Sequence, residues 1–395
     1  MFITLSPSEE LSICWTVGDS MTTAAHEIES YCTQRCGERP NHALQRTRPS
    51  RSGCNPRPAD RIAGLGSLGD CDVLKPSKIQ DMTKYRDSLP QLSNAFFLTD
   101  GGIETTLIFH ERLELPHFAA FHLLKDKGGC EALRRYFRTY AALAKRYEAG
   151  LVLESPTWRA NSDWASKLGY GPEALAEANR KAIDLLCEIR EEFECEKTPM
   201  VISGCVGPRA DGYVPADTMS MQEAQEYHGV QVGTFSRTAA DLVTAITMNY
   251  VEEAIGIVRA ARAFEMPVVI SFTVETDGKL PTGEPLKHAI EKVDATTGGA
   301  PAYYMINCAH PTHFEQVLAT GEPWLGRIRG LRANASTKSH AQLNESTELD
   351  EGDPAQLGRQ HHELLSKLKK LNVFGGCCGT DHRHVEEICK ACITR

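Results

Sequence analysis

The sequence lacks any uninterrupted apolar run of the roughly 18 residues that a membrane-spanning helix needs. Its start carries Glu9, Glu10 and Asp19 and has no basic stretch followed by an apolar one, so we expect no secretory signal peptide. Basic residues are also in deficit, because 43 Lys and Arg stand against 52 Asp and Glu and give a formal net charge of −9. This balance offers no reason to expect nucleic acid or an anionic membrane as a partner.

Regular cysteine spacing is missing, although cysteine itself is abundant. The 14 cysteines are scattered through 395 residues without a signal peptide before them. We therefore interpret them as reduced thiols rather than a disulfide framework, and we expect a cytoplasmic protein. No Gly-x-Gly-x-x-Gly follows the first predicted strand, which argues against a doubly wound dinucleotide-binding sheet.

The first 91 residues differ in composition from the rest of the chain. Residues 35–61 are rich in Arg, Pro, Ser, Gly and Asn and show neither helical nor strand periodicity, so no face is predicted to be buried. We expect residues 1–91 to form a disordered leader and residues 92–395 to form one domain. Met82 is a natural alternative start, so we interpret the leader as an over-extended start of translation.

Short β-like runs alternate with helical stretches from residue 95 onward. The predicted strands cover residues 96–99, 151–154, 200–203, 242–246, 268–272, 303–306, 328–331 and 372–374. The predicted helices cover residues 131–148, 172–194, 220–238, 251–264, 286–293, 312–319 and 354–371. Strands that alternate with helices pair in parallel, and eight such units predict a (β/α)₈ barrel, also called a TIM barrel, which typically takes about 250 residues.

Three cysteines follow predicted strands at the end of the barrel where barrel enzymes carry their chemistry. Cys308 follows the sixth strand, and Cys377 and Cys378 follow the eighth. Thiolates are soft ligands that suit Zn²⁺, and three of them leave the fourth tetrahedral position open, as catalytic zinc requires. We predict one zinc ion per chain on these residues. Buried apolar thiols are the alternative.

A zinc ion on three thiolates is a poor activator of water, but it accepts a substrate thiol as fourth ligand. A free thiol has a pKa of about 8.5 and is mostly protonated at neutral pH. Metal coordination deprotonates it and leaves the sulfur nucleophilic. The fitting reaction is attack of this sulfur on an activated methyl group. A non-catalytic zinc or redox protein built on the vicinal pair Cys377 and Cys378 is the rival from another class.

Five strand-end motifs resemble the homocysteine S-methyltransferase family, which consists of zinc-dependent barrels. This family includes betaine–homocysteine and S-methylmethionine–homocysteine methyltransferases and the homocysteine half of cobalamin-dependent methionine synthase. The resemblance extends from residue 95 to the C-terminus and spares the leader. Its motifs are Thr99-Asp100-Gly101-Gly102, Glu154-Ser155-Pro156-Thr157-Trp158, residues 204–208, Ile306-Asn307-Cys308 and Gly375-Gly376-Cys377-Cys378-Gly379-Thr380.

The resemblance implies methyl transfer from a small sulfonium or ammonium donor to homocysteine, which gives methionine. It places the three zinc ligands on Cys308, Cys377 and Cys378. The Asp-Gly-Gly turn of the family holds the amino acid part of homocysteine, so Asp100 and Gly101 inherit that role. The expected partners are a small thiol and a methyl donor of undetermined identity. We expect no attached cobalamin or folate module, and we leave open a corrinoid protein in trans and the oligomeric state.

One position departs from the family pattern. Members carry a glutamate at the end of the fourth strand that grips the substrate amino group, whereas Ile246 stands at this place here. A buried ammonium without a carboxylate partner is costly. Either Glu154 or Glu275 takes over this contact, or the acceptor is a different small thiol or selenol.

Several residues near the strand ends have a second interpretation. Asp100 before glycine is also a common turn signal, and Glu154 also suits a structural ion pair. Thr157 and Glu275 are predicted substrate contacts that serve equally as support. Trp158 suits an aromatic pocket mouth for a positively charged donor.

Other thiols and polar residues near these motifs are expected to have lesser roles. Cys389 and Cys392 lie one turn apart on the predicted C-terminal helix, and we interpret them as incidental rather than as a metal pair. A further group is interpreted as lining, covering or surrounding the site: Cys205, Arg209, Tyr213, His310, His382 and His384.

Overall fold

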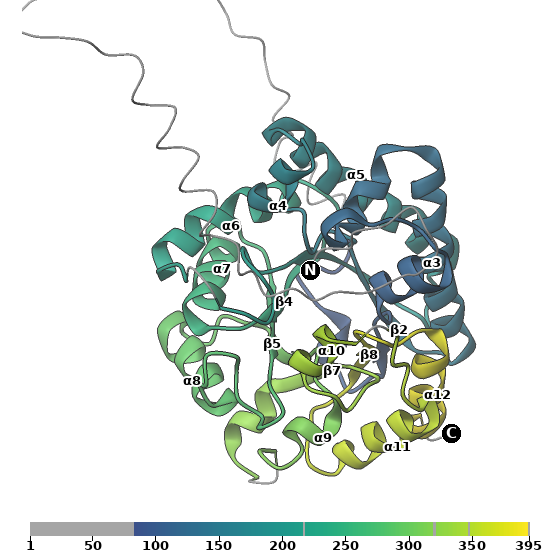
Figure 1. Ribbon diagram of the computed structural model, residues 1–395, viewed down its shortest axis with the longest axis vertical. Helices are drawn as coiled ribbons and strands as arrows, with labels where there is room; N and C mark the ends of the chain where they lie inside the picture. Colours follow the sequence, from purple (N-terminus) through teal and green to yellow (C-terminus); the bar gives the residue numbers. More distant parts are fainter. Residues whose placement is uncertain (1–82, 216–217, 319–320, 347, 394–395) are drawn as a thin grey trace, which may run out of the picture. The chain divides into compact units, whose positions relative to one another are not determined.

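Eight parallel strands close into a barrel in the computed structural model, which describes residues 83–393 except 216–217, 319–320 and 347. The strands follow one another around the ring in sequence order, and β1 pairs with β8 to close it (Figure 1). The strands are β1 Phe97–Leu98, β2 Gly150–Glu154, β3 Met200–Val206, β4 Leu242–Met248, β5 Val268–Thr273, β6 Tyr303–Asn307, β7 Ile328–Ala333 and β8 Val373–Gly376. The predicted (β/α)₈ barrel is confirmed, and each predicted strand overlaps an observed one.

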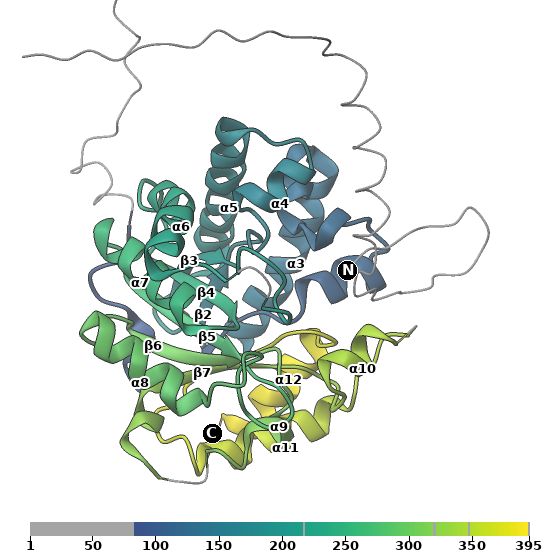
Figure 2. The same cartoon turned by 60° about the vertical axis from the view of Figure 1, so that its left-hand side comes forward.

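Helices surround the strands on the outside of the ring (Figures 1 and 2). The α-helices are α3 Lys127–Arg146, α4 Ser162–Lys167, α5 Pro172–Phe193, α6 Met221–Phe235, α7 Val251–Ala263, α8 Leu286–Thr297, α9 Pro311–Phe314, α10 His340–Asn344, α11 Pro354–Leu365 and α12 His382–Cys392. Shorter helical turns are η1 Pro90–Leu92, η2 Thr105–His110, η3 Pro116–Phe118, η4 Ala120–Lys125 and η5 Pro323–Arg327. The helices predicted at 312–319 and 354–371 are shorter than expected, since α9 ends at Phe314 and α11 at Leu365.

Local capping explains where several of these helices begin. The side chain of Asp126 accepts a hydrogen bond from the backbone N–H of Gly129 at the start of α3. Ser220 and Glu223 form a reciprocal capping box at the start of α6. Such caps satisfy backbone N–H groups that have no partner within the helix, so they define the first turn.

Part of the segment that we assigned to the leader belongs to the barrel. Arg86 donates hydrogen bonds to the carbonyl oxygens of Ser236, Thr238 and Ala240, and Leu89 is buried with the side chains that fill the barrel interior. The predicted boundary at residue 92 is therefore too late, because these polar anchors carry no periodic signal in the sequence. Residues 1–82 lie outside the described residues, so the leader prediction for them stays a prediction.

Apolar side chains fill the interior of the barrel toward the amino ends of its strands. The cluster contains Leu89, Phe97, Val152, Val201, Leu242, Val269, Tyr303, Met305 and Val373. A second, larger cluster joins the outer faces of the strands to the helices. Both faces of each strand are therefore covered, as is usual for parallel sheets. Three buried charged groups, Asp100, Glu154 and Arg332, lie at the carboxyl ends of the strands.

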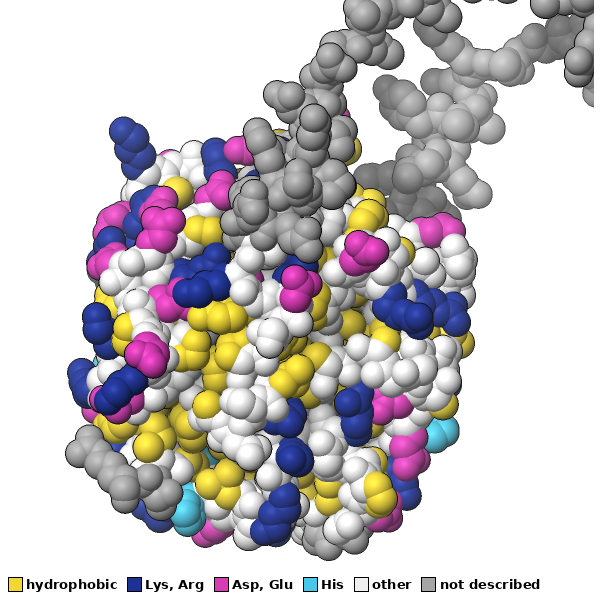
Figure 3. All heavy atoms as spheres, turned by 180° about the vertical axis from the view of Figure 1, so that it is seen from behind, with side chains coloured by type: hydrophobic (Ala, Val, Ile, Leu, Met, Phe, Trp, Pro, Cys, Tyr) yellow, Lys and Arg dark blue, Asp and Glu magenta, His cyan; other side chains and the backbone are white. Residues whose placement is uncertain are grey.

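The outer surface mixes charges of both signs. On the face seen in Figure 3, Lys and Arg side chains are interspersed with Asp and Glu side chains. Among the described residues, no helix has the length and apolar character that crossing a membrane would require.

Candidate active site

Three cysteine sulfurs meet at the carboxyl ends of β6 and β8. The Sγ atoms of Cys308, Cys377 and Cys378 all lie within 4.8 Å of one another. Cys308 and Cys377 form a disulfide with Cα atoms 5.4 Å apart, and Cys378 is free. This pair differs from our expectation of reduced thiols, because two strand ends aim both sulfurs at one point. All three predicted ligands are thus together, and reduction of the pair would free three thiolates for a metal.

Backbone hydrogen bonds between neighbouring strands position these cysteines. The N–H of Cys308 donates to the carbonyl of Arg332 at 3.1 Å, and the N–H of Cys377 donates to the carbonyl of Ala333 at 2.8 Å. Cys308 adopts a left-handed backbone with φ of 54°, a conformation that costs a non-glycine residue energy and is common at functional sites. The thiols are therefore positioned by the barrel itself rather than by mobile side chains alone.

Glycines before Cys377 permit the close approach of β8 to the end of β1. A Cβ atom on Gly375 would collide with the side-chain oxygen of Thr99 and lie 2.6 Å from the carbonyl oxygen of Asp100. A Cβ atom on Gly376 would collide with the side chain of Thr380. Only glycine fits at these two positions, because a larger residue would collide with its neighbours. The cysteine pair comes next in the sequence, so this tight packing also fixes where the pair begins.

His340 supports the thiol cluster from α10. Its Nε2 donates to the carbonyl oxygen of Cys308 at 2.6 Å, and its Nδ1 lies 2.9 Å from Oε1 of Glu275. Glu275 was predicted as a substrate contact, but its carboxylate is paired with this histidine. Sequence reasoning missed His340, because it lies 32 residues from Cys308 and only the fold brings the two together.

Asp100 forms a buried ion pair that the sequence did not reveal. Its Oδ1 lies 2.6 Å from Nη2 of Arg332, and its Oδ2 accepts a hydrogen bond from the Tyr136 hydroxyl at 2.9 Å. Burial and the nearby Asp100 charge raise the pKa of Tyr136 well above its usual range, which keeps this donor protonated. The available signal was the charged residue Arg332 beside the apolar residues of β7. Arg332 also donates to the carbonyl of Gly101 at 3.3 Å, so it anchors the whole Asp-Gly turn.

The two remaining predicted contacts lie inside the protein. Glu154 ends β2 with 4% exposure, and burial raises its pKa to about 7 although Arg332 opposes the shift. Thr157 is fully buried, and its hydroxyl donates to the carbonyl of Cys205 at 2.7 Å. Thr157 therefore has a structural partner in the turn after β2, whereas the Glu154 carboxyl keeps one oxygen without a hydrogen bond among the described residues.

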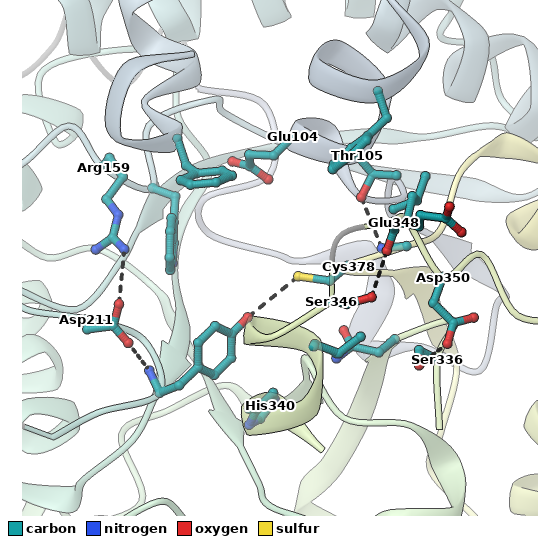
Figure 4. Close-up of a pocket in the computed structure, with 18 residues that line it drawn as sticks. Glu104, Thr105, Arg159, Asp211, Ser336, His340, Ser346, Glu348, Asp350 and Cys378 are labelled. Carbon is teal, nitrogen blue, oxygen red and sulfur yellow. Dashed lines mark hydrogen bonds and ion pairs between the residues drawn. The ribbon is translucent and has the colours of Figure 1, made fainter. Parts of the chain in front are cut away.

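A cavity of about 150 Å³ opens beside Cys378 (Figure 4). Phe109, Phe118, Trp158 and Tyr213 contribute aromatic surface to it. Its charged lining residues are Glu104, Arg159, Asp211, Glu348 and Asp350. Of the predicted site residues, Cys378 lines this cavity, whereas the following do not: Asp100, Gly101, Glu154, Thr157, Glu275, Cys308 and Cys377.

Tyr213 connects the cavity to the thiol cluster. Its hydroxyl lies 3.6 Å from Sγ of Cys378, and its ring centre lies 4.1 Å from that of His340. The expectation that the loop after β3 covers the pocket is met by Tyr213. Arg209 on the same loop does not line the cavity and instead pairs with Asp163 at 2.7 Å.

Arg159 is held between two indole rings. Its guanidinium carbon lies 4.1 Å from the ring centre of Trp158 and 3.9 Å from that of Trp164. Its Nη1 donates to the carbonyl of Ala210 at 2.8 Å. Burial lowers the pKa of Arg159 to about 10, so the group stays charged at neutral pH. This stack fixes the Trp158 ring, which also donates its N–H to the carbonyl of Ile246 at 3.2 Å.

Glu104 was also missed by the sequence reasoning. It precedes η2 and lines the cavity, and its side chain makes no capping hydrogen bond to that helix. Burial raises the pKa of Glu104 to about 7. A carboxylate four residues beyond Asp100, in the turn after β1, was the available signal.

The other candidate residues lie outside the thiol cluster and the cavity lining. His310 and His384 accept backbone hydrogen bonds at the starts of α9 and α12, and neither belongs to the thiol cluster. Cys389 and Cys392 are buried free thiols on α12. His110, Glu351 and Asp381 lie close together, but Arg383 already pairs with both carboxylates. His382 and Cys205 also lie outside the cavity lining.

A parallel barrel with three converging thiols at its carboxyl rim belongs to the class of barrel enzymes that carry their chemistry at strand ends. The homocysteine S-methyltransferase family model matches residues 97–392. The chain therefore belongs to this family and is a methyltransferase.

Solved structures share the fold of this chain. The chain is similar to the homocysteine methyltransferase MmuM from Escherichia coli in its metallated form, with a TM-score of 0.58, 17% identity, and coverage of 75% of this chain and 96% of that chain. The oxidised form of that protein gives a TM-score of 0.58 and 18% identity, with coverage of 76% and 97%. These identities show a shared fold. No curated protein sequence matches the chain.

Proposed function

We propose that this protein transfers a methyl group from a small sulfonium or ammonium donor to the thiol of homocysteine and forms methionine. The observation that carries this proposal is the convergence of Cys308, Cys377 and Cys378 beside an aromatic-lined cavity. Family membership supports the acceptor, and the cavity supports a cationic donor. A reducing compartment such as the cytoplasm would keep these thiols available for metal.

The donor set fits one zinc ion per chain on these three cysteines. Zinc–sulfur bonds of about 2.3 Å in tetrahedral geometry place the sulfurs roughly 3.8 Å apart. The observed separations within 4.8 Å are compatible with this after reduction of the Cys308–Cys377 pair. When bound, the ion would supply positive charge that favours the thiolate form of the acceptor.

The remaining chemistry falls to residues of this chain. The aromatic faces of Phe109, Phe118, Trp158 and Tyr213 attract a sulfonium or quaternary ammonium group and exclude water from it. The Tyr213 hydroxyl is placed to donate to Cys378 and restrain that side chain. Transfer then needs positioning of the donor methyl in line with the acceptor sulfur, and little proton transfer.

The Asp100–Arg332 pair supports the loop that we propose to hold the amino acid part of the acceptor. Arg332 contacts both the Asp100 carboxylate and the Gly101 carbonyl, so the turn after β1 has one defined conformation. We also propose Glu154 as a contributor to the electrostatics of the site, and we interpret Thr157 and Glu275 as supports. Glu275 acts through His340.

One observation favours a second acceptor. Ile246 is buried with 6% exposure and offers no carboxylate for an ammonium group. A small thiol or selenol without an amino group is therefore the alternative acceptor.

A methylation assay on the reduced, zinc-loaded full chain tests the proposal. Homocysteine is offered with S-methylmethionine, S-adenosylmethionine, betaine or a methyl-corrinoid protein, and methionine is measured with and without a chelator. We expect methionine with one donor and its loss on chelation. Absence of methionine with every donor, while zinc is retained, would reject homocysteine as acceptor and direct the assay to other thiols and selenols.

A further inference from the structure

Glu104 is a cavity carboxylate that forms no ion pair with any residue that the structure describes. Glu104 is half-buried, and its side chain points into the cavity from the turn after β1 (Figure 4). Among the described residues, none forms an ion pair or a side-chain hydrogen bond with it. A partly buried carboxylate loses hydration, and a hydrogen bond from the backbone of Glu104 itself offsets only part of this loss, so a cationic ligand would stabilise it.

The two arginines whose charges act on this carboxylate are engaged with other groups. Burial raises the pKa of Glu104, and the positive charges of Arg332 and Arg159 oppose this shift, but neither arginine forms an ion pair with Glu104. Arg159 is stacked between two indole rings and donates to the Ala210 carbonyl. Arg332 is paired with Asp100. The Glu104 carboxyl is thus without a committed cation among the described residues, and a bound cation would favour its charged form.

The other carboxylates near the thiols do not offer the same position. Glu154 is buried outside the cavity lining, and Glu275 is paired with His340. Glu348 lines the cavity but is exposed to solvent, where ion pairs contribute little. Asp211 and Asp350 are also partly buried in the lining, but Asp211 lies 4.0 Å from Arg159 and Asp350 lies 3.3 Å from Lys338. Among the described lining carboxylates, Glu104 therefore combines partial burial beside the aromatic surface with the absence of an ion pair.

We propose that Glu104 is a specificity-determining residue that binds the cationic group of a small-molecule substrate next to Cys378. This inference rests on the proposed function. The shared ligand chemistry is an organic cation, either the ammonium of an amino acid acceptor or the onium centre of the methyl donor. Glu104 thereby supplies, from the turn after β1, a carboxylate that Ile246 within β4 cannot supply.

The test is a binding measurement with ligand pairs that differ only in the cation. Homocysteine is compared with 4-sulfanylbutanoate, which lacks the ammonium, and betaine is compared with 3,3-dimethylbutanoate, which replaces the charged nitrogen by carbon. Calorimetry with reduced, zinc-loaded protein gives Kd for each ligand with wild type and with Glu104→Gln. We expect wild type to prefer the cationic member of one pair by about tenfold or more, and Glu104→Gln to reduce this preference below about threefold.

Matched variants separate this role from a structural one. Glu348→Gln removes a charge from the same cavity and should leave both preferences unchanged. Glu104→Asp keeps the charge and should retain part of the preference, which also covers the case in which Glu104→Gln is unstable. Zinc content and thermal unfolding confirm that each variant is folded.

Each outcome decides the proposal. Loss of preference in the homocysteine pair assigns Glu104 to the acceptor, and loss in the betaine pair assigns it to the donor. Unchanged preferences in both pairs, or no preference in wild type, would overturn it. Because binding is read without turnover, this failure is distinct from failure of methyl transfer, which the methionine assay reports.

Discussion

At the residue scale, the thiol cluster carries the strongest expectation. Cys308→Ala should lower zinc content at least about tenfold and abolish methyl transfer, because two protein thiolates remain where three are needed. Metal analysis and the methionine assay measure the two effects together. Cys195→Ala is the matched control, because Cys195 is an exposed free thiol outside the cluster. Full activity of the Cys308→Ala variant without bound metal would contradict the zinc proposal.

The buried pair of Asp100 and Arg332 yields a stability prediction at the same scale. Asp100→Asn leaves a guanidinium with 6% exposure beside a neutral partner and should lower the free energy of unfolding by about 3–5 kcal/mol. Denaturant unfolding measures the loss. Adding Arg332→Met to this variant should recover part of it, since the unpaired charge is removed. Equal and additive losses from the two changes would show that the pair is not coupled.

At the scale of elements, the tight contact between β8 and β1 is decisive. Gly375→Ala should lower the free energy of unfolding by about 1–3 kcal/mol or more and reduce zinc content, because its Cβ would displace the end of β1. Unfolding curves and metal analysis report both effects. Gly326→Ala provides the control, since nothing lies within 4 Å of a Cβ placed there. Equal behaviour of the two variants would refute the packing argument.

Individual elements were largely predictable from their own residues. Val268–Thr273 and Tyr303–Asn307 read as short apolar runs and are strands, and Pro172–Phe193 has helical periodicity and is α5. The order of segment 83–91 was not predictable from its own residues. Arg86 and Leu89 are ordered by contacts with the barrel, through a hydrogen bond to the Ala240 carbonyl and through burial in the interior cluster. The order of this segment depends on partners far away in the chain.

At the scale of the whole molecule, the burial of one histidine makes the free energy of unfolding depend on pH in the acidic range. Burial lowers the pKa of His361 to about 4, and its Nδ1 donates to the carbonyl of Leu357. Below about pH 6.5, the ordinary pKa of histidine, the imidazole of His361 binds a proton in the unfolded chain. In the folded chain the same imidazole stays neutral down to about pH 4. The free energy of unfolding should therefore fall as the pH drops from about 6.5 to 4, by up to about 3 kcal/mol.

Unfolding measured at several pH values checks this linkage. His361→Gln should weaken the dependence between pH 6.5 and 4 by about one bound proton. His362→Gln, at the exposed neighbouring position, should keep the wild-type dependence. A His361→Gln variant with the full wild-type dependence would show that other groups cause the acid sensitivity.

The sequence by itself determined the barrel and the three sulfurs at its rim. Strand and helix periodicity is local, and in a parallel barrel the carboxyl end of every strand meets at one rim, so Cys308 and the pair Cys377–Cys378 had to converge. Only the tertiary structure decided which carboxylates are free. Asp100 and Glu275 pair with Arg332 and His340, while none of the described residues forms an ion pair with Glu104. Charge pairing depends on distances between residues remote in sequence, which local patterns do not encode.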